Sequence, residues 1–356
     1  MCNRRGAFAS VCVQNFIRCL VPLVIACGGD STQNPPLVDG SVGSDGSLPM
    51  PDSTIGPPEP EVVVINQSYL ESIDVHLGDI YWATDPFTGK GQVKKVTPGG
   101  QPVTLAAQED HPVSIDVGPG FIEDTAFWAL DSLVGQVRQI ATSGAPPLSS
   151  VDANDVVYCL TLDGDRVFIG TRSAVMSKNL TNTSALITIA SGYGNGVLAI
   201  DADANGVVFG TRTTSGAWIV ASVPRAGGTV TTLYTGSQPI RDIAIVGANV
   251  IWPENSKILR VPRSGGSASL VTTITNNLAW RITTDGSKLF VAAAQGTTSP
   301  TSATGKIVEV DPVTGTQKEL ATDQAEPADI AVDANYVYWA NFGLGAGTGQ
   351  ILRLKR

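Results

Sequence analysis

The sequence has few of the residues on which common catalytic mechanisms depend. It contains two histidines, His76 and His111, so no histidine lies in the last two thirds of the chain. Of its five cysteines, only Cys159 lies beyond residue 27. No pattern therefore predicts a histidine base beside a serine or cysteine nucleophile. An intramolecular disulfide is not expected in the body of the protein, where we expect Cys159 to be a small buried apolar residue.

Basic residues and long apolar runs are also scarce. The chain has 23 Lys and Arg against 32 Asp and Glu, a net charge of −9. Nucleic-acid binding requires clustered basic side chains that neutralise phosphates, so this charge argues against it. It also argues against docking of the folded body on anionic lipid. After the first 26 residues, no segment has the roughly 20 apolar residues that a membrane-spanning helix needs.

The first 26 residues have the features of an export signal. Arg4, Arg5 and Arg18 precede or flank a short apolar stretch, Cys19 to Ala26, which is too short to span a bilayer. The sequence Val24-Ile25-Ala26-Cys27 resembles the lipobox of bacterial lipoproteins. In that family the cysteine is lipidated and becomes the first mature residue. The resemblance implies an exported protein anchored through Cys27 to the bacterial cell envelope, at the outer membrane or the periplasmic face, with surface exposure left open. An ordinary signal cleaved by another peptidase is the alternative.

Residues 27–60 are expected to form a spacer without a packed core. Residues 28–60 contain five acidic and no basic residues, with abundant Pro, Gly and Ser. Low hydrophobicity combined with one sign of charge is typical of disordered linkers.

The remainder, residues 61–356, consists of a repeat of about 43 residues, a period that fits four-stranded propeller blades. Each repeat has a short apolar strand, a turn and a second strand centred on an aromatic or aliphatic residue. The seven central residues are Tyr81, Phe127, Phe168, Val208, Ile251, Phe290 and Tyr338. A third strand, a Gly-containing turn and a fourth strand follow. We predict an all-β, seven-bladed β-propeller of four-stranded antiparallel blades, with six or eight blades as alternatives.

One motif gives this region a family resemblance. Tyr81-Trp82-Ala83-Thr84-Asp85 is similar to the Tyr-Trp-Thr-Asp (YWTD) motif, with Ala83 inserted. Residues 61–356 resemble bacterial seven-bladed propellers of the NHL and YWTD type. The resemblance implies the fold and no particular ligand.

Ring closure is predicted from the two ends of this region. The last repeat stops after its third strand, Gln350 to Lys355, whereas an additional strand, Glu61 to Ile65, precedes the first repeat. Pairing of these strands would complete the seventh blade and cover two sheet edges.

Candidate binding residues follow from the usual position of ligands at one mouth of a propeller channel. Residues four positions after the central residues fall in the loops of that mouth. Charged and amide residues there form a candidate binding rim together with Trp280 and Arg281, which lie in the loop before blade 6. The rim residues are Asp85, Asp131, Arg172, Arg212, Asn255, Trp280 and Arg281. Opposite charges on two sides of the mouth could orient a zwitterionic ligand, a sugar or a partner protein. Solvated loop residues, surface ion pairs and a Trp280 ring packed between blades are the alternative interpretations.

A metal site is a further hypothesis. Asp74 and Asp116 occupy equivalent positions in neighbouring innermost strands and could hold Ca²⁺ or Mg²⁺, which bind oxygen ligands. The equivalent residues in the later repeats are expected to be Thr161, Ala199, Ala244, Thr283 and Ala331. Alternatively, the two carboxylates accept backbone N–H bonds and hold the blades together.

The sequence thus favours a monomeric envelope lipoprotein whose propeller acts as a binding or protein-interaction scaffold, with an envelope protein or a glycan as its partner. Two alternatives remain open: a divalent-metal-dependent hydrolase or lyase at the channel mouth, and a sugar-binding lectin. No catalytic residue and no cofactor other than the hypothetical metal ion is assigned.

Overall fold

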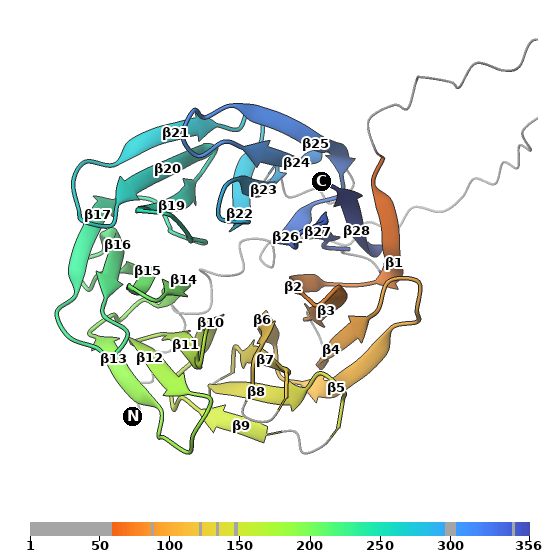
Figure 1. Ribbon diagram of the computed structural model, residues 1–356, viewed down its shortest axis with the longest axis horizontal. Helices are drawn as coiled ribbons and strands as arrows, with labels where there is room; N and C mark the ends of the chain where they lie inside the picture. Colours follow the sequence, from red (N-terminus) through yellow and green to blue (C-terminus); the bar gives the residue numbers. More distant parts are fainter. Residues whose placement is uncertain are drawn as a thin grey trace, which may run out of the picture. The chain divides into compact units, whose positions relative to one another are not determined.

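Each repeat folds into a four-stranded antiparallel sheet, and seven such sheets surround a central axis (Figure 1). The computed structural model describes residues 59–86, 89–120, 123–132, 135–145, 149–295, 304–343 and 346–356. The prediction of a seven-bladed all-β propeller is confirmed, and the six- and eight-bladed alternatives are excluded. The predicted signal peptide and nearly all of the predicted linker, including Cys27, lie outside the described residues. No helix in the described part of the chain could cross a membrane.

Every blade runs from an innermost first strand to an outermost fourth strand. Blade 1 consists of β2 (Leu70–His76), β3 (Asp79–Thr84), β4 (Gly91–Val96) and β5 (Val103–Glu109). Blade 2 consists of β6 (Pro112–Gly118), β7 (Thr125–Leu130), β8 (Gln136–Ala141) and β9 (Ser149–Asp152). Blade 3 consists of β10 (Val157–Asp163), β11 (Arg166–Thr171), β12 (Ala174–Asn179) and β13 (Ile187–Ser191). Blade 4 consists of β14 (Val197–Asp203), β15 (Gly206–Arg212), β16 (Trp218–Val223) and β17 (Thr231–Gly236).

The remaining three blades have the same order, and the seventh takes its outermost strand from the beginning of the region. Blade 5 consists of β18 (Ala244–Val246), β19 (Asn249–Glu254), β20 (Lys257–Pro262) and β21 (Ser269–Thr273). Blade 6 consists of β22 (Leu278–Thr284), β23 (Leu289–Ala294), β24 (Gly305–Val310) and β25 (Gln317–Gln324). Blade 7 consists of β26 (Pro327–Val332), β27 (Tyr336–Asn341), β28 (Gly349–Lys355) and β1 (Glu61–Gln67).

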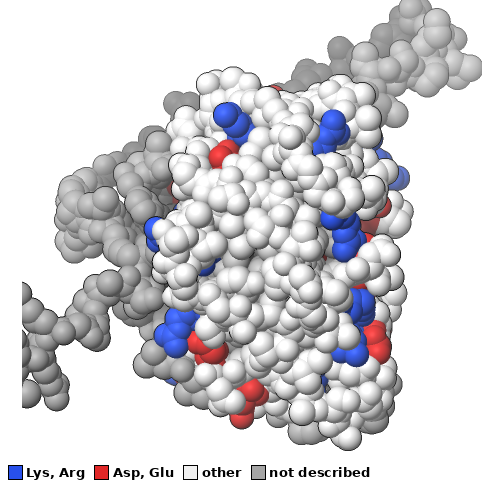
Figure 2. Space-filling model, turned by 90° about the vertical axis from the view of Figure 1, so that its left-hand side faces the viewer, with Lys and Arg blue, Asp and Glu red and all other residues white. Residues whose placement is uncertain are grey.

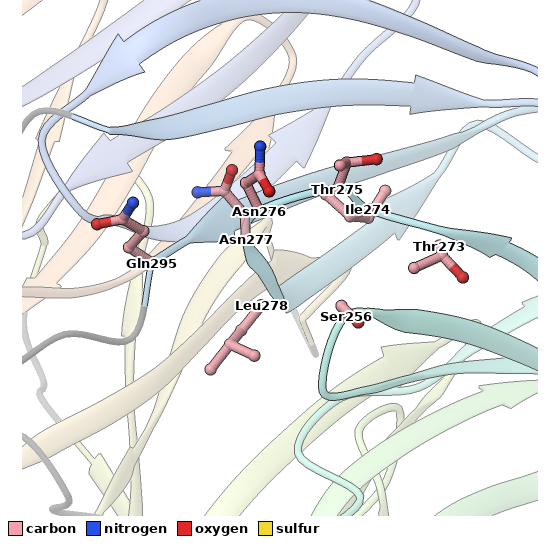
Figure 3. Close-up of a pocket in the computed structure, with 8 residues that line it drawn as sticks. All are labelled: Ser256, Thr273, Ile274, Thr275, Asn276, Asn277, Leu278 and Gln295. Atoms are coloured by element: carbon pink, nitrogen blue, oxygen red, sulfur yellow. The ribbon is translucent and has the colours of Figure 1, made fainter.

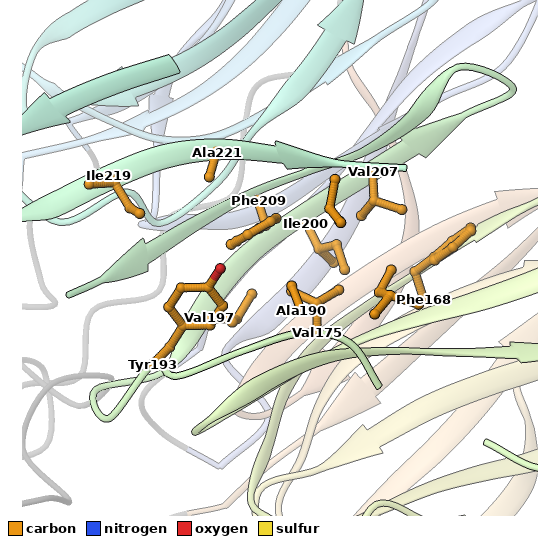
Figure 4. Packing of buried hydrophobic residues seen from close by; sticks show 12 residues of the cluster. Phe168, Val175, Ala190, Tyr193, Val197, Ile200, Val207, Phe209, Ile219 and Ala221 are labelled. Atoms are coloured by element: carbon orange, nitrogen blue, oxygen red, sulfur yellow. The ribbon is translucent and has the colours of Figure 1, made fainter. Parts of the chain in front are cut away.

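The hydrophobic core lies between neighbouring blades. The seven central residues of the second strands are all at most 2% exposed, as the repeat pattern predicts. In the cluster between blades 3 and 4, Phe168 and Val175 pack against Ile200, Val207 and Phe209 (Figure 4). Burial of each such side chain contributes about 1.5–3 kcal/mol, so the blade-to-blade contacts carry much of the stability.

A tryptophan follows the central residue in four blades, and its indole bonds to the preceding blade in three of them. Trp128 Nε1 donates to Glu109 Oε2 at 2.9 Å, at the end of β5. Trp82 and Trp339 donate in the same way to Gln67 and Gln324, at 3.3 and 2.8 Å. An amide or carboxylate at the end of these three outer strands thus satisfies a buried donor of the next blade.

The N-terminal strand closes the ring as predicted. Strand β1 pairs antiparallel with β28, with Glu61 opposite Arg353 and Gln67 opposite Gly349. Val64 on β1 is 3% exposed, and the Arg353 guanidinium pairs with the Glu61 carboxylate at 2.8 Å. This strand therefore joins the first and last repeats through both burial and an ion pair.

The two faces of the ring differ in their loops. The lower face is the face of the ring that carries the turns from first to second strands and from third to fourth strands. The upper face carries the loops from second to third strands and from each fourth strand to the next blade. Since Glu61 lies opposite Arg353, near the lower end of β28, the chain enters the propeller on the lower face.

Arginines on the lower face join neighbouring blades. Arg225 of blade 4 pairs with Asp163 of blade 3 and lies over the Phe168 ring, 5.1 Å from its centroid. Arg263 and Arg356 pair in the same way with Asp203 and Asp285 of the blades before them. Between the faces, the outer strands β13, β17 and β21 have no charged residue. Figure 2 shows this side of the molecule as a largely uncharged wall, with most Lys, Arg, Asp and Glu along its two margins.

Candidate functional site

The innermost strands β2, β6, β10, β14, β18, β22 and β26 surround the axis and position the candidate site (Figure 1). In six of them the pairing with the second strand is interrupted near the upper end, as between Leu70 and Ser72 in blade 1. Such bulges redirect the side chain of the extra residue. Blade 5 has Arg241 at the matching position, two residues before Ile243. We call this set the bulge ring: Glu71, Val113, Tyr158, Leu198, Arg241, Trp280 and Ala328.

Below the bulge ring, three aspartates occupy one register position. Asp74 pairs with Tyr81, Asp116 with Phe127, and Asp201 with Val208. The expected equivalence of Ala199 with Asp74 is therefore wrong. The apolar residues Leu198 and Ile200 suggested that Ala199 aligns with Asp74. Strand β14 continues to Asp203, which pairs with Gly206 across a tight turn, so the residue that aligns with Asp74 is Asp201, two positions later.

Each of these carboxylates bridges two blades. One oxygen of Asp74 accepts the Val75 N–H at 2.8 Å, and the other accepts the Val117 N–H of blade 2 at 2.7 Å. Asp201 bonds to Ala202 and to Ile245 of blade 5 in the same way, at 2.8 and 2.7 Å. The innermost strands have no neighbour on the axis side, so these carboxylates satisfy backbone donors at a sheet edge. This is the structural role that the sequence analysis weighed against metal binding.

The surroundings favour protonation of these acids. Burial raises the pKa of Asp116 to about 6 and that of Asp201 to about 7, despite the backbone N–H bonds. Burial and the nearby charge of Asp116 raise the pKa of Asp74 well above its ordinary value. Within the described residues, no three His, Cys, Asp or Glu side chains converge as a metal site requires. The Ca²⁺ or Mg²⁺ site at Asp74 and Asp116 therefore stays a prediction.

Arg281 lies one register step higher, between two other acids. Asp242 of blade 5 and Asp329 of blade 7 accept the N–H groups of Ile282 and Ile73, at 2.8 and 2.9 Å. Burial acts to lower the pKa of Arg281, but the carboxylates of Asp242 and Asp329 outweigh it, so the pKa is raised. Arg281 is therefore an internal counter-ion near the axis. The sequence had predicted it on the binding rim instead.

Cys159 occupies the same register on blade 3. It is half-buried, less than expected, and its thiol donates to the Val197 carbonyl at 3.3 Å. Burial raises the pKa of this thiol to about 12, which disfavours the reactive thiolate.

Two of the charged rim residues bond to neighbours on the upper face. Asp85 is 1% exposed and accepts a hydrogen bond from His111 Nδ1 at 2.8 Å, whereas the His111 side chain is 39% exposed. Arg172 pairs with Asp155 at 3.0 Å. The ion pair at Arg172 reduces the proposed separation of charge across the mouth.

The charges of Asp131 and Arg172 both act on Tyr158 of the bulge ring. The pKa of Tyr158 is raised first by burial, then by the charge of Asp131, and is lowered by that of Arg172. Two predicted rim residues thus influence an aromatic residue that no sequence pattern singled out.

Arg212 and Asn255 lie on the upper face without joining this group. Arg212 Nε donates to the Gly216 carbonyl at 2.9 Å, and its guanidinium lies 5.9 Å from the Trp218 ring centroid. Asn255 has a positive φ of 56°, and its carbonyl accepts the Ala279 N–H at 2.8 Å.

Trp280 contacts Arg241, which the sequence analysis missed. The Arg241 guanidinium lies 5.0 Å from the Trp280 ring centroid, and the Arg241 carbonyl accepts a bond from Arg281 Nη1 at 2.8 Å. The sequence signal that could have found Arg241 is its place two residues before the apolar Ile243, matching Trp280 before Ile282.

A pocket of about 370 Å³ opens on the upper face between blades 5 and 6 (Figure 3). Its lining is uncharged: Ser256, Thr273, Ile274, Thr275, Asn276, Asn277, Leu278 and Gln295. In Figure 3 the amides of Asn276, Asn277 and Gln295 gather at one end, and Thr273 and Ser256 lie at the other. Asn277 Nδ2 donates to the Thr304 carbonyl at 2.9 Å, which fixes one of these amides.

No protein-family model and no curated protein matches the chain. Solved structures do match. A computationally designed protein named Ika8 shares 14% identity over 79% of this chain and 82% of its own, with a TM-score of 0.56. A chain of the mitotic checkpoint complex shares 12% identity over 86% of this chain and 97% of its own, with a TM-score of 0.60. At such identities the likeness shows the fold alone. The resemblance to NHL and YWTD propellers is thus supported only for the seven-bladed architecture.

Proposed function

We propose that this chain is an exported, lipid-anchored binding module of the bacterial cell envelope, and that its propeller holds a partner on the upper face. One geometric observation carries the proposal. Strand β1 begins on the lower face, so the chain that leads from Cys27 joins the propeller at the opposite end of the blades from the loops of the upper face. The bulge ring lies at the upper end of the innermost strands, on the side of those loops.

The distribution of charge supports the same assignment. On the lower face, Arg225, Arg263 and Arg356 are engaged with carboxylates of neighbouring blades. On the upper side, Arg241 and Trp280 of the bulge ring form a cation–aromatic pair. Tryptophan and arginine are the residues most often found at the energetic centre of protein interfaces.

The anchor and the binding face are tested separately. Membrane fractionation of cells that express the chain or its Cys27→Ala variant tests the anchor: the chain is expected in the membrane fraction and the variant in the soluble fraction. An equal distribution of both would contradict lipidation at Cys27.

The binding face is tested by capture from envelope extract with the full chain in mild detergent. Arg241→Gln combined with Trp280→Ala should release the captured partner. The lower-face variant Leu77→Ala is the matched control, since Leu77 is 87% exposed, and it should retain that partner. Retention by the upper-face variant together with loss by the control would move the binding site to the lower face.

A neutral glycan is the second candidate partner, and the pocket between blades 5 and 6 favours it. Amide and hydroxyl groups beside the aliphatic Leu278 match the mixture of hydroxyl groups and apolar ring surface that a sugar presents. On a glycan array, Asn276→Gly should abolish binding while keeping the backbone conformation, because Asn276 has a φ of 63°. Trp280→Phe tests whether the neighbouring indole takes part. Array binding that survives both changes would contradict this candidate.

No observation on the described residues favours the hydrolase or lyase over binding. Both oxygens of Asp74 are engaged with backbone N–H groups, and no third metal ligand converges on them among the described side chains.

A further inference from the structure

Arg241 carries a charge that the described protein does not compensate. Its side chain is half-buried and forms no ion pair with a carboxylate of the described residues, and burial and the like charge of Arg281 both lower its pKa. Other half-buried arginines, such as Arg225, Arg263 and Arg353, each pair with an Asp or Glu. A partly desolvated cation beside a second cation is unfavourable unless an anion joins it.

The local geometry holds this cation in place. The Arg241 carbonyl is fixed by Arg281 Nη1 at 2.8 Å, and its guanidinium lies over the ring of Trp280, a residue of the next blade. No hydrogen bond within the described chain uses the Arg241 guanidinium nitrogens. Because the guanidinium is planar and presents parallel N–H donors, it can bind a carboxylate or phosphate group in two-point fashion.

The acids near the axis restrict where an anion can bind. Asp242 and Asp329 flank Arg281, while Asp74, Asp116 and Asp201 lie one step lower on blades 1, 2 and 4. Glu71 belongs to the bulge ring on blade 1 and also acts on Arg281. Those of these carboxyl groups that are ionised repel an anion from the axis, so an anion is held by Arg241 at the bulge ring and not deeper along the axis.

We propose that Arg241 and Trp280 form a binding site for the anionic group, carboxylate or phosphate, of the upper-face ligand. This inference rests on the proposed function and specifies the chemistry of its binding face. Arg281 acts behind this site as a positioning residue that holds the Arg241 backbone. The flat Trp280 ring beside the guanidinium suits a ligand with an apolar or aromatic group next to its anion.

Isothermal titration calorimetry on the full chain in mild detergent tests the site with three small probes. Benzoate and phenyl phosphate carry the two anionic groups, and benzamide is the neutral counterpart of benzoate. We expect at least one anion to bind at least tenfold more tightly than benzamide, which corresponds to about 1.4 kcal/mol. The anion that binds more tightly identifies the group, carboxylate or phosphate. Equal binding of benzamide and both anions, or binding of none, would overturn the proposal.

Arg241→Gln should weaken binding of the preferred anion at least tenfold. Arg260→Gln is the matched control: Arg260 is also a half-buried arginine of blade 5, but it lies on the third strand β20 and donates to the Pro312 carbonyl at 2.7 Å, and its variant should bind within twofold of the parent chain. If thermal unfolding shows that Arg241→Gln does not fold, Arg241→Lys takes its place. It keeps the charge, loses the two-point geometry, and should bind severalfold more weakly. Unchanged binding in the folded variant would also overturn the proposal.

The outcomes separate this inference from the function on which it rests. Loss of the envelope partner in the upper-face variant without any anion binding would leave the binding face standing and remove the anion site. Anion binding that depends on Arg241, without capture of any envelope partner, would support the anion site and contradict the proposed function.

Discussion

Replacing Asp201 with asparagine removes a carboxyl group that the fold holds near the axis. Burial raises its pKa to about 7, compared with 3.8 for an ordinary aspartate. The folded state therefore binds a proton more tightly than the unfolded state. The stability due to this proton is fully present below pH 4 and is lost as the pH rises through 7.

The magnitude follows from the difference between the two pKa values. Three pKa units correspond to at most about 4 kcal/mol, and the partial contact of Asp201 with solvent reduces this to about 2–4 kcal/mol. Asparagine does not ionise, but it has one acceptor oxygen for the two N–H groups of Ala202 and Ile245, and the loss of one bond costs about 1 kcal/mol. We expect Asp201→Asn to stabilise the protein by about 1–3 kcal/mol at pH 8 and to destabilise it by about 1 kcal/mol at pH 4.

Urea denaturation of the parent chain and the variant at pH 4, 6 and 8 measures this change of sign. Asp323→Asn is a suitable control, because Asp323 is exposed on the outer strand β25, away from the axis. The reasoning is refuted if Asp201→Asn changes the free energy of unfolding by the same amount at all three pH values. It is also refuted if the variant is destabilised more at pH 8 than at pH 4.

Three further predictions concern the contacts between blades. Trp128→Phe removes the indole N–H that donates to Glu109, which is 2% exposed, and should lower the free energy of unfolding by about 1–3 kcal/mol in urea denaturation; a loss below 0.5 kcal/mol would contradict the bond. Val64→Asp places a charge in the β1–β28 pair and should lower the melting temperature by several degrees, whereas the exposed Val62→Asp should change it little. Gly170→Ala should lower the melting temperature, because a Cβ there would lie 2.5 Å from Cys159 Sγ and 2.9 Å from the Val197 carbonyl; Gly164→Asn, in an open turn, is the control, and equal melting of both would count against the close contact.

The architecture could be predicted from the sequence because the same strand pattern occurs in all seven repeats. The seven central residues from Tyr81 to Tyr338 recur at similar spacing, and each is buried in the structure. The strand that begins at Glu61 could cover both open sheet edges only by pairing with the last strand of the chain, and β1 does pair with β28. The first of these predictions rests on strand periodicity, which is a local property of the chain, and the second on the general need to pair exposed sheet edges.

The arrangement near the axis was predicted less well, because it depends on register and on neighbouring blades. Asp201 was missed because its apolar neighbours suggested a pairing two residues away. Asp242 precedes the short strand β18, so the pattern gave no sign that its side chain reaches Ile282 of the next blade. The hydrogen bond between Asp85 and His111 joins two loops of the upper face, and no spacing in the sequence indicates that contact.

The binding of a partner on the upper face is tested most directly by site-specific photocrosslinking in cells. A photoreactive amino acid replaces either the exposed Asn255 on the upper face or Leu77 on the lower face of the full chain. We predict a discrete crosslinked product from position 255, lost when Arg241→Gln and Trp280→Ala are added, and none from position 77. A product from position 77 alone would contradict the proposal that the upper face is the binding face.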